Sequence, residues 1–422
     1  MDHRALLIAY HFPPIQGSSG VLRTLSLVRS LPEFGWEPLV LTAHPRAYPN
    51  TVDTMPIEIP DETIVHRAFA LDTARHLSIG GKYPGFLAAP DRWWSWYLGA
   101  LPSGLRMIRK YRPRVIWSTA PLATAHLIGL TLARASGLPW IADIRDLLTE
   151  PGDPALPAAW RATHWIERRT LRSANRVVVV SPGQHQEYSK RFPDIPDERF
   201  EVIPNGYDET AFKAIEEGPL NTPPISGHPQ APLTLLHSGV LYPDGRNPLP
   251  LFRAIAELIQ EGALGSGEIR VVLRACGHEE QYSEMVRQLG LEDTIFFRPA
   301  LPYKDALKEM LEVDGLIVLQ GQSCNTAIPA KIYEYMRARR PILGLVHPDG
   351  FTCQVLESTG YLDLAETESS DRIRPVLQQF IERIRSGRAF IPSYEDVQSF
   401  SRRRSAERVA QLMNSITQST GH

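Results

Sequence analysis

The strongest constraint on the fold of this chain is the regular alternation of short apolar runs with helical stretches. Residues 5–10 read ALLIAY, an uninterrupted apolar run that is typical of a parallel strand covered on both faces. Later runs in the first half follow the same pattern, at residues 38–42, 114–119, 139–146, 176–181 and 200–206. Strands separated by helical segments indicate right-handed βαβ units, so we predict a parallel α/β sheet.

The same alternation begins again in the second half of the chain, with apolar runs at residues 233–239, 269–276, 294–299, 315–320 and 341–346. Residues 211–232 lie between the two halves, are rich in Pro, Gly and Glu, and are interpreted as a linker region. A chain of 422 residues is also too long for one ordinary core. We therefore predict two doubly wound, Rossmann-like domains, at residues 1–210 and 233–390, followed by an amphipathic helix within residues 391–422.

Composition excludes several classes of protein. The formal net charge of -2 argues against a nucleic-acid-binding protein, which would usually be basic. Cys276, Cys324 and Cys353 show neither a metal spacing nor a disulfide framework, which fits a reducing cytoplasm. No run approaches the ~20 apolar residues of a membrane span. We therefore expect a cytoplasmic protein that binds no nucleic acid.

A strand, a polar loop and a helix in the second half carry the sharpest sign of a ligand site. The strand GLIVLQ at residues 315–320 is followed by the loop GQSCNTAI and then by PAKIYEY, where Pro329 suits a first helical turn. Backbone N–H groups at a helix N-terminus bind phosphate in α/β proteins. Lys331 adds a cation there. Glu334 lies on the same helix face and can accept hydrogen bonds from ribose hydroxyls, so the pattern predicts a nucleotide site.

Two other loops follow predicted strands, and ligands bind at the carboxyl ends of parallel strands. The loop after the first strand holds glycines that allow a ligand near the backbone and two serines: Gly17, Ser18, Ser19 and Gly20. A tight turn with a serine N-cap is the alternative. After the strand that ends at Gly239, Arg246 precedes a helix and is placed to bind a diphosphate. A surface arginine in a turn is the alternative for this position.

Charged residues close the buried strand at residues 139–146, where Asp143, Arg145 and Asp146 stand together. Charged groups are rarely buried unless paired, so one aspartate is expected to form a structural pair with an arginine. The other is expected to bind substrate hydroxyls or to accept a proton. His126, in a neighbouring predicted helix, is a candidate catalyst, with a place in the core or on the surface as the alternative.

Tryptophans precede a basic helix within residues 91–114, in which Arg106, Arg109 and Lys110 share one side. A membrane-surface patch and an ordinary helix with aromatic packing are both open interpretations. No Asp-x-Asp sequence occurs in the chain and its histidines show no ligand spacing, so no metal site is expected.

Taken together, these loops resemble family 4 of the retaining glycosyltransferases, which have the GT-B architecture. The likeness covers nearly the whole chain and rests on several long motifs in order: YHFPPIQGSSG, APLATAHLIGLTLARASGLPWIADIRD, VVVVSPG, FEVIPNGYD and PAKIYEYMRARRPIL. The opening motif looks like the polysaccharide-assembly branch of that family. The resemblance implies two facing Rossmann-like domains, an acceptor-binding one at residues 1–210 and a donor-binding one at residues 233–390, with the terminal helix crossing back to the first domain.

The resemblance also implies roles for single residues. Arg246 and Lys331 would hold the donor diphosphate, and Glu334 would hold the ribose. The loop that contains Leu301, at residues 298–302, would lie by the base. Backbone amides would assist at the phosphates, near Thr326, Ala327 and Ile328, and the first loop would approach the donor with Gly17, Ser18, Ser19 and Gly20.

The chain departs from the family pattern at three places. Many relatives carry a glutamate eight positions before Glu334, where it contacts the transferred sugar, but this chain has Thr326 there, so Asn325 or the backbone is expected to make that contact. Arg246 is followed by Asn247 in place of a lysine. The loop after the strand at residues 114–119 reads STAPL and lacks a histidine. Four candidates are therefore expected to steady the reacting sugar: Asp143, Arg145, Asp146 and His126.

These expectations combine into a retaining, metal-independent glycosyltransferase of cell-surface polysaccharide or glycan biosynthesis. The donor would be a nucleotide sugar, which is a substrate, so no cofactor is expected. The acceptor would be a glycan or a lipid-linked glycan, and the enzyme would be cytoplasmic with peripheral contact to the inner membrane surface. Two alternatives remain open, namely a nucleotide-sugar epimerase on the same fold and a non-catalytic nucleotide-sugar-binding partner.

Overall fold

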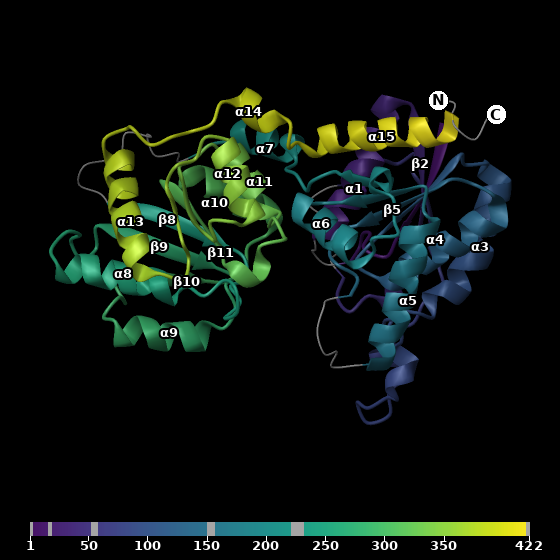
Figure 1. Ribbon diagram of the computed structural model, residues 1–422, viewed down its shortest axis with the longest axis horizontal. Coiled ribbons are helices and arrows are strands. Elements are labelled where there is room, and N and C mark those ends of the chain that lie inside the picture. The colour runs from purple at the N-terminus through teal and green to yellow at the C-terminus, as the bar shows by residue number, and fades with distance from the viewer. Residues whose placement is uncertain (1–2, 16–18, 52–57, 150–156, 221–231, 419–422) are drawn as a thin grey trace. The chain divides into compact units, whose positions relative to one another are not determined.

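The computed structural model describes residues 3–15, 19–51, 58–149, 157–220 and 232–418. The chain divides into two compact units (Figure 1). Unit 1 comprises Met1–Asn205 and Arg402–His422, and unit 2 comprises Gly206–Ser401. The chain therefore returns to unit 1 after completing unit 2.

Unit 1 is built on a seven-stranded sheet with the order β3-β2-β1-β4-β5-β6-β7, in which every pair is parallel. The strand order reverses between β1 and β4, as in a doubly wound fold. The strands are β1 (His3–Ala9), β2 (Trp36–Ala43), β3 (Ile64–Ala68), β4 (Val115–Thr119), β5 (Trp140–Ile144), β6 (Arg176–Val179) and β7 (Phe200–Val202).

Helices cover both faces of this sheet because successive strand residues point to opposite sides. Leu6 and Ile8 of β1 pack on the face that carries α3 (Trp96–Tyr111) and α4 (Ala123–Ser136), whereas Ala5 and Leu7 pack on the face that carries α1 (Ser19–Ser30) and α15 (Arg402–Gln418). The α-helices are α1 (Ser19–Ser30), α2 (Thr73–His76), α3 (Trp96–Tyr111), α4 (Ala123–Ser136), α5 (Pro157–Ser173), α6 (Pro182–Arg191) and α15 (Arg402–Gln418). Short 3-10 helices are η1 (Leu31–Phe34), η2 (Pro45–Ala47), η3 (Gly85–Ala88) and η4 (Asp197–Arg199).

Unit 2 contains a six-stranded parallel sheet with the order β10-β9-β8-β11-β12-β13, which reverses between β8 and β11. Its strands are β8 (Leu233–Ser238), β9 (Ile269–Arg274), β10 (Ile295–Arg298), β11 (Gly315–Gln320), β12 (Ile342–Val346) and β13 (Leu364–Ala365). Its helices are α7 (Glu209–Glu216), α8 (Leu249–Gln260), α9 (Glu279–Gln288), α10 (Tyr303–Glu312), η5 (Gln322–Cys324), α11 (Lys331–Ala338), α12 (Phe351–Ser358), α13 (Ser370–Arg385) and α14 (Tyr394–Gln398). The predicted fold class, two doubly wound parallel-sheet domains, is confirmed.

Details at the ends of unit 2 differ from the expectation drawn from composition. Helix α7 lies partly within the predicted linker at residues 211–232. Arg337 of α11 forms ion pairs with Glu209 and Glu216 of this helix, at 2.7 and 2.8 Å. Because these ion pairs hold α7 in unit 2, the unit begins at Gly206 rather than after residue 232. Residues 221–231 of the expected linker lie outside the described residues.

The C-terminal segment forms two helices where one was expected within residues 391–422. Helix α14 belongs to unit 2 and α15 to unit 1, so the break between them coincides with the return of the chain to unit 1. The apolar face of α15 packs on unit 1 through Val409, Met413 and Ile416. Burying three such side chains stabilises this packing by about 1.5–3 kcal/mol each. The expected packing of the terminal helix against the first domain is therefore observed.

Candidate functional site

The strand-order reversal of unit 2 brings two loops together at the carboxyl ends of β8 and β11. Gly239 follows β8 with φ = 117°, a backbone conformation that favours glycine. A Cβ atom on Gly239 would lie 2.8 Å from Lys331 Nζ, so the absence of a side chain also makes room for the lysine. The two loops are joined where Gly321 N–H donates to Gly245 O at 2.6 Å.

Lys331 is the first residue of α11, and its Nζ donates to Nε2 of His237 across 3.1 Å. His237 lies at the buried end of β8, and its Nδ1 is 2.9 Å from Ile317 O of β11. Because a carbonyl oxygen only accepts hydrogen bonds, Nδ1 carries the proton and Nε2 is the acceptor for lysine. Sequence analysis missed His237, although the one ionisable residue in the run LTLLHSG was a visible signal.

Burial and the neighbouring charges shift the pKa of Lys331. Burial lowers the pKa of Lys331 to about 7, and repulsion by the Arg246 guanidinium acts in the same direction, while Glu334 opposes both. Burial also lowers the pKa of His237 well below its usual value, with Lys331 as the next cause. The lysine therefore loses its charge near neutral pH, and the imidazole beside it stays neutral.

Arg246 is tied to the same loops through Gln320, the last residue of β11. Arg246 Nε donates to Gln320 Oε1 at 2.8 Å, and Gln320 Nε2 donates to Cys324 O at 3.0 Å. The guanidinium also lies over the ring of Tyr242, 5.4 Å from its centroid. The structure thus places Arg246 close enough to Lys331 for its charge to help lower the pKa of the lysine, a repulsion that an anion between the two side chains would relieve.

Glu334 lies one turn further along α11 and accepts a hydrogen bond from the Tyr303 hydroxyl at 3.0 Å. Tyr303 opens α10 directly after the loop that contains Leu301, whose side chain is exposed. The predicted base loop and the predicted ribose carboxylate are therefore linked by Tyr303, which sequence analysis did not single out.

The loop before α11 departs in detail from the expected phosphate cradle. Helix α11 begins at Lys331 rather than at Pro329. The Ala327 N–H donates to Cys324 O at 3.0 Å, so in this structure the amide forms a hydrogen bond within the turn instead of pointing toward a phosphate. Thr326 is exposed, whereas Ile328 is buried in the core below the loop. Asn325 Nδ2 lies 3.1 Å from Nδ1 of His347, which fixes that side chain beside the end of β12.

In unit 1, the loop between β1 and α1 is only partly described. Gly17 and Ser18 lie outside the described residues, and Ser19 begins α1. Gly20 is buried against the guanidinium of Arg145, because a Cβ atom there would lie 2.5 Å from Nη2. Arg145 Nη2 also donates to Ala120 O at 2.7 Å. The structure therefore brings Gly20 and Arg145 together, which the sequence did not show.

Asp143 fits the structural alternative, a buried aspartate–arginine pair, and its partner is Arg23 of α1. Arg23 of α1 binds both carboxylate oxygens, with Nη2–Oδ1 at 2.9 Å and Nε–Oδ2 at 3.1 Å, and the Thr119 hydroxyl donates to Oδ2 at 2.7 Å. Asp143 is completely buried, and Arg23 further donates to Pro204 O at 3.1 Å. This pair joins α1 to β5 and to the segment after β7. Asp146, in contrast, is exposed.

His126 is buried beneath the same edge of the sheet. Its Nδ1 lies 2.9 Å from the Ser118 hydroxyl, which accepts a hydrogen bond from Trp140 Nε1 at 2.9 Å. Burial lowers the pKa of His126 to about 4 and that of His11 to a similar value, so both imidazoles are neutral at pH 7. Without an exposed surface, His126 cannot touch a ligand in this arrangement and can act only through its neighbours.

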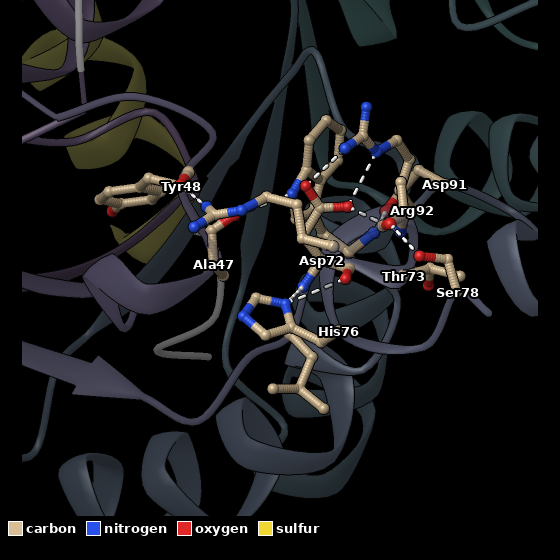
Figure 2. Close-up of polar contacts among 12 residues, drawn as sticks. Ala47, Tyr48, Asp72, Thr73, His76, Ser78, Asp91 and Arg92 are labelled. Carbon is tan, nitrogen blue, oxygen red and sulfur yellow. Dashed lines mark hydrogen bonds and ion pairs between the residues drawn. The ribbon is translucent and has the colours of Figure 1, made fainter. Parts of the chain in front are cut away.

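A second polar cluster at this edge was not predicted. Arg92 Nε donates to Asp72 Oδ1 at 2.9 Å (Figure 2). Asp72 also caps α2 by accepting from Ala74 N–H at 3.0 Å. Asp91 accepts from the Thr124 hydroxyl at 2.7 Å, and burial raises the pKa of Asp91. The Asp91–Thr124 bond fastens the segment between β3 and α3 to α4, and the Arg92–Asp72 ion pair compensates charge within that segment.

The described residues hold no group of three or more His, Cys, Asp or Glu side chains that could bind a metal ion. None of the helices in the described part of the chain combines the length and the apolar character that crossing a bilayer requires. The expectations of metal independence and of peripheral membrane contact remain predictions.

Comparison with known proteins gives a match in sequence for unit 1. Residues 20–206 match the family described as "Glycosyl transferase 4-like domain". The chain is 24% identical over 201 residues to alpha-maltose-1-phosphate synthase of Mycolicibacterium smegmatis, which covers 42% of this chain and 48% of the relative. The chain thus spans about half the length of the curated relative that it matches.

Comparison of folds covers the whole chain. Sucrose-phosphate synthase from Thermosynechococcus elongatus is similar with a TM-score of 0.66 at 15% identity, covering 99% of this chain and 100% of that one. The Anabaena protein HepE, in complex with UDP, gives 0.61 at 14% identity, covering 98% and 100%. A UDP-N-acetylglucosamine 2-epimerase gives 0.54 at 11% identity, covering 97% and 94%. The fold is that of GT-B glycosyltransferases, and epimerases share it.

Proposed function

We propose that this protein transfers a sugar from a nucleotide-sugar donor to a glycan acceptor with retention of configuration. The observation that carries the proposal is the group formed by Arg246, Lys331 and Glu334 at the strand-order reversal of unit 2. Two cations that repel each other suit a diphosphate, and a carboxylate on the same helix suits a ribose. The family match over residues 20–206 supports transfer as the reaction.

In this proposal the protein acts mainly on the leaving group. Arg246, Lys331 and the positive end of α11 stabilise the negative charge that develops on the departing diphosphate. The acceptor hydroxyl attacks from the face that the diphosphate leaves, and its proton passes to a phosphate oxygen. The glycosidic bond to the diphosphate breaks while the bond to the acceptor oxygen forms, so neither a metal nor a cofactor is required.

Residues of unit 1 take the acceptor-side roles. Arg145 and Asp146 are proposed to contact the reacting groups, because Asp146 is exposed and Arg145 reaches the start of α1 at Gly20. Asp143 and His126 are proposed as positioning residues, since both are completely buried. On the donor side, Asn325 or the backbone near Thr326 is proposed to contact the transferred sugar.

A panel of UDP-, GDP-, ADP- and dTDP-sugars tests the donor assignment by thermal shift. The cognate donor at 100 times its Kd should stabilise the protein by about 2.7 kcal/mol and raise Tm measurably. Glu334→Ala should weaken this binding roughly 10- to 100-fold, because a hydrogen bond to a charged group contributes about 1.5–3 kcal/mol. Glu309→Ala, on neighbouring α10, is the matched control, since Glu309 pairs with Arg274 instead. Equal donor affinity in Glu334→Ala and wild type would remove the ribose assignment.

The same panel of nucleotide sugars, assayed for reaction products instead of thermal shift, separates the two rival functions. An epimerase would convert the donor into a new nucleotide sugar without any acceptor. This function is tested because the fold is also similar to that of an epimerase. A non-catalytic partner would bind the donor tightly and release no nucleoside diphosphate with any acceptor. Transfer is supported only if nucleoside diphosphate and glycosylated acceptor appear together in equal amounts.

The acceptor is proposed to be lipid-linked, because one segment of unit 1 combines an excess of positive charge with exposed apolar side chains. Residues 73–142 contain nine Lys and Arg but one acidic residue, so their net charge is +8 in a chain of net charge -2. Within this segment the tight turn between Ile79 and Lys82 exposes Ile79 by 89%, and Phe86 and Leu98 are exposed by 70% and 58%. Exposed apolar groups among cations are typical of proteins that bind a bilayer surface.

Vesicle sedimentation tests this membrane contact. Wild type should sediment with vesicles that contain phosphatidylglycerol and not with pure phosphatidylcholine, and salt should release it. Ile79→Asp with Phe86→Asp should reduce the bound fraction at least about fivefold, because the buried apolar area is lost. Leu362→Asp, in unit 2 and 73% exposed in wild type, should leave binding unchanged. Equal sedimentation of the double variant and wild type would contradict the assignment.

A further inference from the structure

In the part of the chain that the structure describes, no carboxylate forms an ion pair with Lys331. Its Nζ instead donates to Nε2 of His237 at 3.1 Å, and His237 Nδ1–H is committed to Ile317 O at 2.9 Å. The imidazole therefore offers the lysine a lone pair without a negative charge. This arrangement fixes the position of the nitrogen while leaving its charge uncompensated.

The other charged groups around Lys331 do not supply the missing compensation. Arg246, on the loop after β8, repels the ammonium, and Gln320 at the end of β11 is neutral. Glu334 of α11 attracts it, but this carboxylate is engaged with the Tyr303 hydroxyl at 3.0 Å. Burial outweighs the attraction, which is why the pKa of Lys331 falls from its ordinary 10.5 to about 7.

We propose that His237 is a positioning residue that holds Lys331 without a counter-charge, so that binding of the donor diphosphate is coupled to the uptake of one proton by the lysine. This inference rests on the proposed donor site. The step is balanced, because the neutral amine takes a proton from solvent as the two phosphate charges arrive, and the ammonium then pairs with them. His237 remains neutral throughout, since its own pKa lies far lower.

The direction of the pH dependence follows from linkage. Above pH 7 the empty site holds mainly the neutral amine, so donor binding must include protonation and weakens as the pH rises. With a pKa of about 7 in the empty site and a much higher one in the complex, Kd should rise roughly 25-fold between pH 6.5 and 8.5. At pH 8.0 roughly 0.9 proton should be taken up for each donor bound.

Titration calorimetry with the best-binding sugar of a panel of UDP-, GDP-, ADP- and dTDP-glucose measures both quantities. These diphosphates are esterified at both ends, so they lack the titrating terminal phosphate, with a pKa near 6, that a nucleoside diphosphate would add. Binding enthalpies at pH 8.0 in two buffers of different ionisation enthalpy give the proton uptake. Lys331→Met should bind more weakly, with no proton uptake and a flat pH profile.

The His237 variants separate positioning from mere core packing. His237→Leu removes the lone pair, so binding should weaken at every pH and begin to fall at a lower pH than in wild type. His237→Gln keeps an acceptor for the lysine and should restore the wild-type profile. Identical pH profiles for wild type and His237→Leu would refute the positioning role. If His237→Leu fails to fold, wild-type binding without proton uptake would still overturn the proposal, and absence of any donor binding would instead refute the proposed function.

Discussion

Replacing both Arg246 and Lys331 by methionine should lower kcat for sugar transfer by roughly a thousandfold or more, while the protein stays folded. Each side chain is proposed to stabilise charge on the departing diphosphate, and removing one such group typically costs about 2.7–4 kcal/mol of transition-state stabilisation. The single variants should each lose roughly a hundredfold, and the two losses should add incompletely because both groups act on one diphosphate.

The geometry gives a reason to expect this large effect. Arg246 is held by Gln320 at 2.8 Å and Lys331 by His237 at 3.1 Å, so both side chains are positioned before any ligand arrives. Preorganised groups need no rearrangement during the reaction, which makes them more effective than mobile surface side chains. Steady-state rates of nucleoside diphosphate release measure the effect once the donor is known.

Arg253→Met is the matched control for this experiment. Arg253 is an exposed arginine of α8 in the same unit, so its loss removes one positive charge, as each single variant does, without touching the site. We expect its rate to stay within about twofold of wild type. A double variant of Arg246 and Lys331 that retained more than a third of wild-type kcat would exclude the proposed role of both cations.

The second large effect concerns stability rather than turnover. Arg23→Met should destabilise unit 1 by about 3–5 kcal/mol, because it leaves the Asp143 carboxylate buried without its cationic partner. The Thr119 hydroxyl, at 2.7 Å, would still donate to that carboxylate, but it is neutral and cannot replace the bidentate guanidinium. Urea unfolding followed by tryptophan fluorescence measures unit 1 alone, since all eight tryptophans lie within residues 36–165.

Two further variants test the physical reason for this loss. Arg23→Met combined with Asp143→Leu should cost less than Arg23→Met alone, because the stranded charge is removed as well. Glu33→Gln breaks the surface pair between Arg403 and Glu33, both of which are exposed, and should cost less than about 1 kcal/mol. A loss below about 1 kcal/mol for Arg23→Met would show that the buried pair does not stabilise unit 1.

Much of the fold could be predicted because it depends on local patterns. Continuous apolar runs marked strands such as β1 and β11, which are buried on both faces, and the helical segments between them implied parallel connections. The break between α14 and α15 was not predicted, since the sequence there is amphipathic on both sides of Ser399. The predicted linker overlaps α7, which belongs to unit 2. Composition could not show this, because α7 is short and its ion-pair partner Arg337 lies more than a hundred residues later in the sequence.

Only part of the candidate site could be predicted, because many of its contacts join residues that are far apart in the sequence. Lys331 and Glu334 could be recognised from their spacing on one helix, but their partners cannot be read from any local pattern. His237 lies 94 positions from Lys331, and Tyr303 lies 31 positions from Glu334. Likewise, Arg23 reaches Asp143 across 120 positions, so the arginine of the expected aspartate–arginine pair could not be identified from the sequence.

A crystal structure of the protein with its bound nucleotide-sugar donor would test the central claim most directly. The account predicts the diphosphate between Arg246 and Lys331, with nitrogen–oxygen distances of about 2.7–2.9 Å, and a ribose hydroxyl on the Glu334 carboxylate. A diphosphate bound elsewhere, with both of these cations left facing solvent, would contradict it.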